Sequence, residues 1–213
     1  RLDYFENLGV NAIEFMPLCE FDGNLSWGYS PNHYFAIDKA YGTEEQFKTI
    51  VDECHKRGIA VIVDMVFNHA TGNHALEKLY GGYNNLKDNP YFNVSAPHGA
   101  SVFEDWNHDY AATKDHLTRA LKFWMQEYKV DGFRMDLSHG FCGTGCGDRV
   151  NNINYYYNNG VKAVASDAYF ILEHWEGMEE RGGYVSKGMM CWENTNERYQ
   201  EIAMGFYKGT NSS

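Results

Sequence analysis

Residues 132–139, Gly-Phe-Arg-Met-Asp-Leu-Ser-His, place an arginine and an aspartate two positions apart in a short apolar run. Alternate residues of a β-strand share a face, so Arg134 and Asp136 are expected to point the same way, with Phe133 and Met135 packing opposite. Buried charges are tolerable only when they are paired or hydrogen-bonded. The stretch therefore predicts a buried strand that carries either a structural ion pair or part of an active site.

The composition is that of a globular protein with a sizeable core, since 44% of the 213 residues are hydrophobic and 16% are aromatic. The net charge of -11 and the pI near 5.2 argue against nucleic acid or a membrane surface as a partner, because both attract basic patches. The many aromatic rings suit stacking on sugars as well as core packing. No apolar run reaches the length that a transmembrane helix requires.

Predicted strands and helices alternate along the chain, without a low-complexity linker. Such alternation is typical of parallel βα units, and in (β/α)8 barrels polar residues gather at the carboxyl ends of the strands. The predicted strands cover 11–18, 59–67, the Arg134 stretch, 168–173 and 189–192. The predicted helices are an opening helix that ends at Gly9, one that begins at Thr43 with Gln46 in the capping-box position, one carrying Leu117 to Tyr128, and one over 155–164.

The five cysteines are odd in number and scattered, which does not suggest a disulfide framework. The spacing of Cys142 and Cys146 is a weak signal for either a disulfide or a pair of metal ligands. Because no second Cys or His pair stands at zinc spacing, the sequence does not predict a structural metal there.

Three predicted strand ends carry polar residues suited to chemistry: 64–69 (Asp-Met-Val-Phe-Asn-His), the Arg134 stretch, and Glu173 with His174. In order, spacing and placement on successive strands, they resemble the first, second and third short motifs of the α-amylase family, glycoside hydrolase family thirteen. Residues 8–13 and 27–29 are similar to that family as well. The resemblance covers nearly the whole chain and implies an α/β fold, the (β/α)8 TIM barrel.

The resemblance implies a retaining glycosidase in which Asp136 is the nucleophile and Glu173 the general acid/base, with their carboxyl groups roughly 5 to 5.5 Å apart. Arg134 would hold Asp136 ionised, while the apolar residues before Glu173 would favour its protonated form. His69 matches the histidine that binds a sugar hydroxyl, and Tyr29 matches the ring beneath that sugar. Taken singly, His69 is more often an interior histidine and Tyr29 a packing ring. Their joint occurrence favours the functional assignment.

One departure from the family pattern affects the acceptor side of the site. Members that cleave within chains commonly carry Lys-His three and four residues after the nucleophile, and here those positions hold His139 and Gly140. His139 is therefore the candidate for a substrate contact there. The chemistry requires no cofactor, but many relatives hold a structural calcium near the first motif. Asn68, with Asn107 or Asp105, would supply oxygen atoms of the kind that calcium binds.

The family's fourth motif, a His-Asp pair that supplies a third carboxylate, has no counterpart in the sequence. We expect that carboxylate to lie beyond Ser213 and the first barrel strand to precede Arg1. Residues 1–213 are thus predicted to be a single, partial catalytic domain with approximately strands 2 to 6 of the barrel and a long loop, 68–112, after the third strand. Such a piece is expected to be inactive alone, because its sheet is open and a catalytic carboxylate is missing.

The predicted function is hydrolysis of α-1,4- or α-1,6-linked glucans such as starch, glycogen or maltooligosaccharides, with α-glucan as the partner. A branching enzyme or another transglycosylase of the same family is the alternative among enzymes, because a sugar hydroxyl can replace water in the second step. A homologue that binds glucan or a protein without catalysis is the alternative from another class. Neither nucleic acid nor a membrane is expected as a partner.

Overall fold

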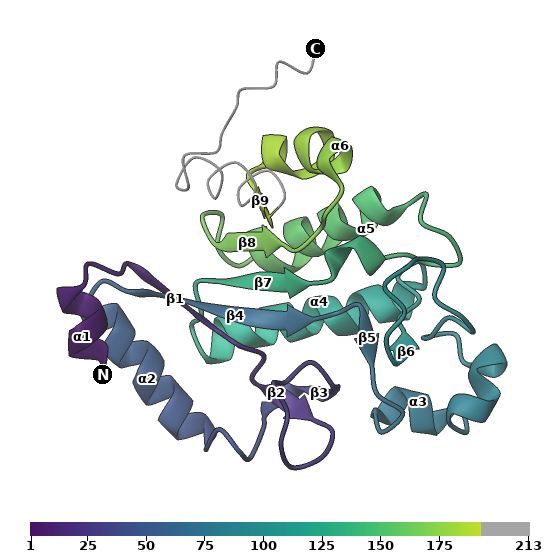
Figure 1. The fold of residues 1–213 in the computed structure, drawn as a ribbon, viewed down its shortest axis with the longest axis horizontal. Helices are drawn as coiled ribbons and strands as arrows, with labels where there is room; N and C mark the ends of the chain where they lie inside the picture. Colours follow the sequence, from purple (N-terminus) through teal and green to yellow (C-terminus); the bar gives the residue numbers. More distant parts are fainter. Residues whose placement is uncertain (193–213) are drawn as a thin grey trace, which may run out of the picture.

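The computed structural model describes residues 1–192, and its centre is a parallel sheet of five strands (Figure 1). The strands lie in the order β1, β4, β7, β8, β9, which is also their order along the chain. Each new strand is added at the same edge, so the sheet winds in one direction as a barrel does, without the reversal of a doubly wound sheet. The strands are β1 Ala12–Phe15, β4 Ala60–Val66, β7 Gly132–Asp136, β8 Tyr169–Leu172 and β9 Met190–Cys191.

The two strands β4 and β7 are buried on both faces. Every residue of β7 is buried, and so is β4 from Val61 to Val66. Strands covered on both faces of a parallel sheet are nearly continuous apolar runs, which is why a charged residue inside one is conspicuous. The register pairs Asp64 with Arg134 and Val66 with Asp136. Charged side chains of neighbouring strands therefore lie at the same level of the sheet.

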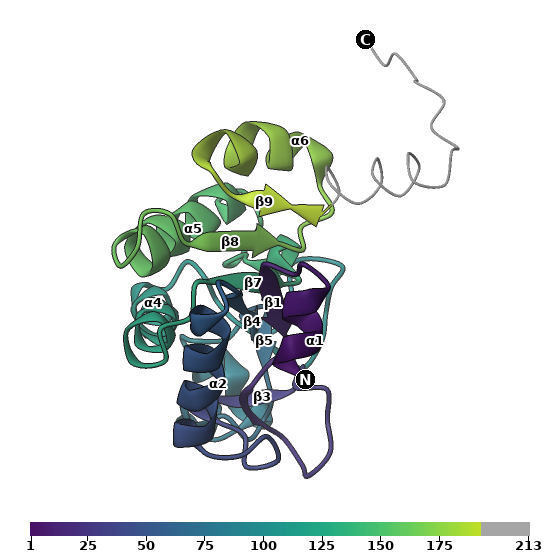
Figure 2. The same cartoon turned by 90° about the vertical axis from the view of Figure 1, so that its left-hand side faces the viewer.

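Helices pack along the sheet, and in Figure 2 α4 and α5 lie on the same side of β7 and β8. The apolar stripe of α4 is fully buried at Leu117, Leu121 and Trp124. None of the helices formed by residues 1–192 combines the length and the apolar character needed to cross a bilayer. The helices are α1 Leu2–Asn7, α2 Glu44–Lys56, α4 Ala111–Glu127, α5 Arg149–Tyr156 and α6 Gly177–Glu179. Two of them continue as π-helices, α5 over Tyr157–Lys162 and α6 over Glu180–Tyr184.

The sequence predicted the start of α2 correctly but not the start of α5. The capping box of α2 forms as the sequence predicts, because Thr43 Oγ1 accepts from Gln46 N at 3.3 Å and Gln46 Oε1 accepts from Thr43 N at 2.9 Å. The helix predicted over 155–164 begins earlier, at Arg149. Asp148 at its N-cap is followed three residues later by Asn151, so the capping-box pattern that identified α2 is absent, and Asp148 makes no side-chain capping hydrogen bond.

Residues 68–112, predicted as one long loop, contain short elements of their own beside the carboxyl end of β4 (Figure 1). Phe92 stacks on Trp106 with 4.2 Å between ring centroids, which gives the segment a small apolar core. A second antiparallel pair follows β1, formed by β2 Cys19–Phe21 and β3 Pro31–Ile37. The elements within 68–112 are β5 His69–Ala70, which pairs antiparallel with β6 Glu104–Asp105, α3 Ala75–Leu79, and a 3-10 helix over Tyr83–Asp88.

Cys142 and Cys146 form a disulfide in the loop between β7 and α5. Their spacing suggested either a disulfide or a pair of metal ligands, and the structure contains the disulfide. Cys19, Cys54 and Cys191 are buried outside any disulfide.

Candidate active site

The candidate catalytic residues meet at the carboxyl ends of β4, β7 and β8. Asp136 is the last residue of β7, and Glu173 directly follows Leu172, the last residue of β8. Met135 pairs with Leu172 across these two parallel strands, so both strands end at the same edge of the sheet. This is the edge at which barrel enzymes carry their active sites.

One guanidinium group contacts three carboxylates at this edge. Arg134 Nη1 donates to both carboxylate oxygens of Asp64 and to Asp136 Oδ1, each at 2.9 Å. Arg134 Nη2 lies 2.7 Å from Glu173 Oε2. Arg134, Asp64 and Asp136 are all buried. The two candidate catalytic carboxylates are therefore held by neighbouring nitrogens of the same side chain.

Three carboxyl groups, those of Asp64, Asp136 and Glu173, contact the single positive charge of Arg134, so acidic groups outnumber basic ones at the site. Burial raises the pKa of Asp136 to about 7, although Arg134 lowers it, and the charge of Asp64 raises it further. Burial likewise raises the pKa of Asp64 and that of Glu14 on β1. Arg134 thus favours the ionised form of Asp136, as expected, but desolvation outweighs its effect on the pKa.

Glu173 is fixed through its main chain and both of its carboxylate oxygens. Its Oε2 accepts from Leu137 N at 3.0 Å, and its Oε1 accepts from Trp175 Nε1 at 3.3 Å. Glu173 N donates to Met135 O at 3.1 Å, and its carbonyl accepts from Ser138 N at 3.0 Å. The end of β8 is thus tied to the segment that follows β7.

Two tryptophans at the site were not identified from the sequence. Trp175 contacts Glu173, and its ring meets that of Trp192 edge to face with 5.7 Å between centroids. Arg134 Cζ lies 4.5 Å from the centroid of the Trp192 ring. Trp175 is 50% exposed, so part of an aromatic surface borders the carboxylates. The sequence did contain a signal for them, because Trp175 closely follows one predicted strand and Trp192 ends another, and the carboxyl ends of these strands share one edge.

His69 and Tyr29 join the same hydrogen-bond network. Tyr29 Oη donates to Asp64 Oδ2 at 2.8 Å, and the Tyr29 carbonyl accepts from His69 Nε2 at 2.9 Å. His69 Nδ1 lies 3.0 Å from Asn68 Nδ2, and burial lowers the pKa of His69. Both ring nitrogens of His69 are therefore engaged by the protein. A sugar contact through either nitrogen requires one of these bonds to be exchanged.

His139 lies at the margin of the site, in the 3-10 turn Ser138–Gly140. Its Nε2 is 3.8 Å from Glu176 Oε2, and its side chain is 32% exposed. The glycine that follows has a packing reason, because a Cβ at Gly140 would lie only 1.7 Å from Asn68 Oδ1. This close approach accounts for the absence of the family's larger residue at that position.

Of the residues predicted to hold calcium, Asn68 is the one whose side-chain oxygen accepts no hydrogen bond from the residues that the structure describes. Asn68 Oδ1 is buried and accepts no hydrogen bond. Asp105 is engaged at both oxygens, by Asn93 Nδ2 at 2.7 Å and by His98 Nε2 at 2.7 Å. Asn107 Oδ1 accepts from Asp109 N at 3.2 Å. Within residues 1–192, no three His, Cys, Asp or Glu side chains gather in a way that would hold a metal ion.

The shared arginine leads to a prediction about stability. Arg134→Met would leave three carboxylates without their cation, two of them buried, and should lower the free energy of unfolding by about 3–5 kcal/mol. Urea unfolding of the complete protein measures this change. The matched control is Arg119→Met, which breaks an exposed pair with Asp115 at 2.8 Å and should cost less than about 1 kcal/mol. Equal effects of the two substitutions would contradict the central role of Arg134.

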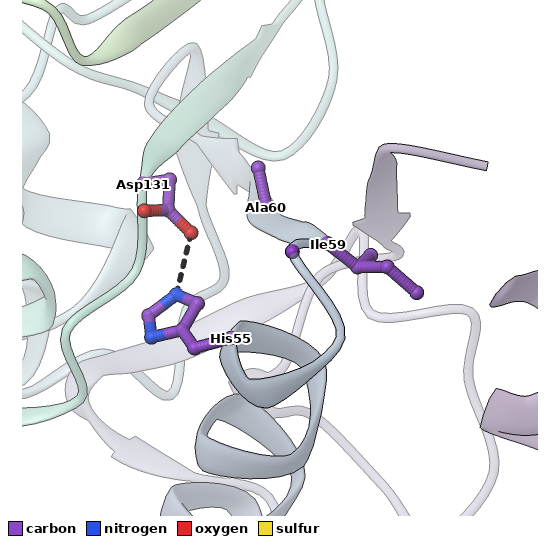
Figure 3. A pocket seen from close by; sticks show the side chains of 5 residues that line it. His55, Ile59, Ala60 and Asp131 are labelled. Atoms are coloured by element: carbon purple, nitrogen blue, oxygen red, sulfur yellow. Dashed lines mark hydrogen bonds and ion pairs between the residues drawn. The ribbon is translucent and has the colours of Figure 1, made fainter. Parts of the chain in front are cut away.

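A separate hollow of about 310 Å³ lies at the opposite end of the strands (Figure 3). It is lined in part by Ile59 and Ala60 at the start of β4, and His55 Nε2 lies 2.8 Å from Asp131 Oδ2 across it. The same carboxylate oxygen accepts from Val61 N at 2.7 Å, so Asp131 fixes the beginning of β4. At the amino ends of barrel strands such residues contribute to stability, and the hollow is separate from the carboxylate site.

A sheet that winds in one direction, with acidic residues at the carboxyl ends of its neighbouring strands, defines a protein of the (β/α)8-barrel class. The chain belongs to the α-amylase family, because the family model "Alpha amylase, catalytic domain" matches residues 1–111. Both the predicted family and the predicted fold class, an incomplete (β/α)8 barrel, are thereby confirmed.

The alignments with individual relatives include most of this chain. They include less than half the length of each relative. It is 29% identical to Isoamylase 1, chloroplastic, of Oryza sativa subsp. japonica, over 99% of this chain and 31% of that protein. It is 35% identical to a malto-oligosyltrehalose trehalohydrolase of Saccharolobus solfataricus, over 65% of this chain and 24% of that protein. Among solved structures, Eubacterium rectale Amy13B has a TM-score of 0.78 at 26% identity, over 97% of this chain and 46% of Amy13B.

Proposed function

We propose that the protein is a glycoside hydrolase that cleaves α-1,4- or α-1,6-linked glucans by a retaining double displacement. The observation that carries this proposal is the pair Asp136 and Glu173, held by Nη1 and Nη2 of one arginine at 2.9 and 2.7 Å. A retaining enzyme needs two carboxyl groups roughly 5 to 5.5 Å apart, one as nucleophile and one as acid/base. Two carboxylates on neighbouring nitrogens of Arg134 suit that spacing.

The roles follow from the surroundings of each carboxylate. Asp136 is the last residue of a fully buried strand, so it attacks the anomeric carbon from a rigid position. Glu173 lies at a more open margin, beside the half-exposed Trp175, where it can donate a proton to the leaving oxygen and later activate water. Arg134 stabilises the negative charge that the site carries when Asp136 is released from the glycosyl ester.

The proposed partner is an α-glucan chain, which agrees with the activities named for several relatives. Beside the isoamylase, these include a 1,4-alpha-glucan branching enzyme GlgB of Paramagnetospirillum magneticum, 34% identical over 63% of this chain and 18% of that protein. A branching enzyme forms the same kind of covalent intermediate and passes it to a sugar hydroxyl. Transglycosylation is therefore the second candidate function, and a homologue that only binds glucan is the third.

The stereochemistry of the first product tests the proposal. When the complete protein hydrolyses maltooligosaccharides, we expect the newly formed reducing end to appear as the α-anomer, followed by slow mutarotation, in proton NMR spectra recorded during the reaction. A β-anomer as first product would overturn the retaining mechanism. Branched product without new reducing ends would favour the transglycosylase. Glucan binding without any product would favour the non-catalytic homologue.

We propose that the reaction needs no cofactor, because two carboxyl groups supply the nucleophile, the acid and the base. A calcium ion would have a structural role. Asn68 Oδ1, which is buried and accepts no hydrogen bond, is the ligand that this chain offers for it. Such an ion would fix the segment after β4 against the turn at Gly140.

A further inference from the structure

A buried polar network lies behind the candidate catalytic residues. It joins the turn after β7 to the segment after β8, and no part of it was assigned a role from the sequence. His174 and Ser138 are fully buried, and Arg149 is 7% exposed. The network consists of Ser138, His174, Glu179 and Arg149.

The hydrogen bond between His174 and Glu179 has a fixed direction. His174 Nε2 lies 2.9 Å from Glu179 Oε2. A carboxylate can only accept, so Nε2 carries the proton and the other ring nitrogen, Nδ1, is an acceptor. Nδ1 lies 3.2 Å from Ser138 Oγ, which also donates to the Glu173 carbonyl oxygen at 3.1 Å, so the single hydroxyl proton is shared between these two acceptors. Ser138 N, at 3.0 Å, and Ser138 Oγ, at 3.1 Å, both face the carbonyl oxygen of Glu173.

The order Ser, His, Glu is that of a nucleophilic triad, but the burial of this group excludes such a role. A nucleophilic hydroxyl must reach its substrate. Ser138 and His174 have no exposed surface, and Ser138 Oγ is directed at the main chain of Glu173. The contact that the group makes with the candidate catalytic residues is instead with the main chain of Glu173.

Arg149 holds the far end of the network and adds a second connection between the two segments. Its Nε and Nη2 donate to the two oxygens of Glu179 at 2.9 and 2.6 Å. Its Nη1 donates to the carbonyl oxygen of His139 at 2.9 Å. Tyr184 Oη lies 3.3 Å from the same carboxylate, and its ring contacts that of His174.

Backbone conformation next to both catalytic carboxylates shows that these segments are held under constraint. Leu137, directly after Asp136, has φ of 41°, and Trp175, two residues after Glu173, has φ of 61°. Residues other than glycine occupy this left-handed region only where the surrounding structure holds them there. The hydrogen bonds from Ser138 and Arg149 supply such restraint.

We propose that Ser138, His174, Glu179 and Arg149 form a positioning unit that fixes Glu173 relative to Asp136. The proposal rests on the function proposed above and assigns none of the four residues contact with substrate. Asp136 belongs to β7 and is held by the sheet, whereas Glu173 follows the end of β8 and depends on this unit for part of its support. Loosening the unit should therefore impair proton donation by Glu173 more than attack by Asp136.

The protonation states of His174 and Glu179 keep the hydrogen bond between them intact at neutral pH. Burial lowers the pKa of His174 to about 4, although the hydrogen bond with Glu179 raises it. Burial raises the pKa of Glu179, but the hydrogen bonds from Arg149 and His174 reverse this and bring it to about 2. Neutral imidazole and ionised carboxylate therefore coexist across the neutral range, and the bond between them keeps its direction.

The test uses two substrates of different leaving-group quality in the complete protein. For His174→Ala and Ser138→Ala we expect kcat/KM on a maltooligosaccharide to fall roughly 10- to 100-fold. On a dinitrophenyl α-maltoside, whose leaving group needs no proton, the fall should stay below about threefold. His174→Gln, whose amide can still donate to Glu179, should lie between His174→Ala and the wild type. Ser186→Ala is the matched control, because its hydroxyl is exposed and donates to Gly182 O at the long distance of 3.5 Å.

The outcomes separate this inference from the proposed function. Equal loss on both substrates, or unchanged kcat/KM in Ser138→Ala, would overturn the positioning role even if Asp136→Asn and Glu173→Gln behave as catalytic substitutions. If those two variants keep activity, the proposed function itself fails. Should His174→Ala not fold, as judged by its melting curve, Ser138→Ala decides, since it removes one buried hydroxyl and leaves Ser138 N on Glu173 O.

Discussion

Asp136→Asn is expected to remove hydrolysis of α-glucan almost completely, by about 10⁴-fold or more in kcat. Asparagine keeps the shape of the side chain, and its oxygen can still accept from Arg134 Nη1, which lies 2.9 Å from Asp136 Oδ1. The amide cannot attack the anomeric carbon to form a glycosyl ester. Initial rates on maltooligosaccharides, together with mass spectrometry of the denatured protein to detect the ester, measure the loss in the complete protein.

The same substitution should not weaken the fold, and this distinguishes a catalytic role from a structural one. Burial raises the pKa of Asp136 to about 7, so between the ordinary aspartate range and pH 7 the folded protein binds more protons at this site than the unfolded chain. The contribution of Asp136 to the free energy of unfolding therefore falls as the pH rises through that window. The asparagine side chain does not titrate, so above pH 7 the Asp136→Asn variant should be at least as stable as the wild type.

Asp52→Asn, an exposed position on α2, is the control and should change neither activity nor stability. Activity above about a tenth of the wild type in Asp136→Asn would show that another group is the nucleophile, because loss of a covalent nucleophile costs orders of magnitude. A strong loss of stability together with the loss of activity would favour the structural ion pair as the role of Asp136.

Much of the fold was predictable because it depends on local patterns. The apolar run of β4 and the capping residues of α2 are signals within a few residues of each other, and the structure forms both elements. The parallel sheet follows from the alternation of strands and helices, whereas its winding in one direction was implied by the family resemblance. The start of α5 was missed because Asp148 is followed three residues later by Asn151, so the sequence shows no capping box there. The pairing of β5 with β6 was missed because each strand has only two residues.

The residues of the carboxylate site could be predicted from the sequence, but the number of carboxylates that contact Arg134 could not. Arg134 and Asp136 are neighbours in sequence, whereas Asp64 reaches Arg134 across 70 positions through the register of β4 and β7. That register places Asp64 beside Arg134 and Asp136, where its charge adds to the burial that raises the pKa of Asp136. Similarly, the sequence shows that His69 follows a strand. Only the folded chain shows that its Nε2 is directed at the carbonyl oxygen of Tyr29.

Glu173→Gln is expected to separate the two halves of the reaction. Glutamine can keep the contact with Leu137 N, which lies 3.0 Å from Glu173 Oε2, but it cannot donate a proton to the leaving oxygen. The kcat/KM for a maltooligosaccharide should fall about 10²- to 10⁴-fold, because general acid catalysis is lost. For a dinitrophenyl α-maltoside the kcat/KM should change little, since it reports the steps up to formation of the glycosyl enzyme and this leaving group needs no proton.

Turnover of the dinitrophenyl substrate should nevertheless slow, because Glu173 is also the base that activates water in the second step. We expect a burst of dinitrophenolate followed by a slow steady rate, and a mass increase of one maltosyl unit on the protein, located at Asp136 by peptide mapping. Glu45→Gln, exposed on α2, should show neither effect. If kcat/KM falls equally for both substrates and no covalent species accumulates, Glu173 is not the acid/base, and the ion pair with Arg134 at 2.7 Å is structural.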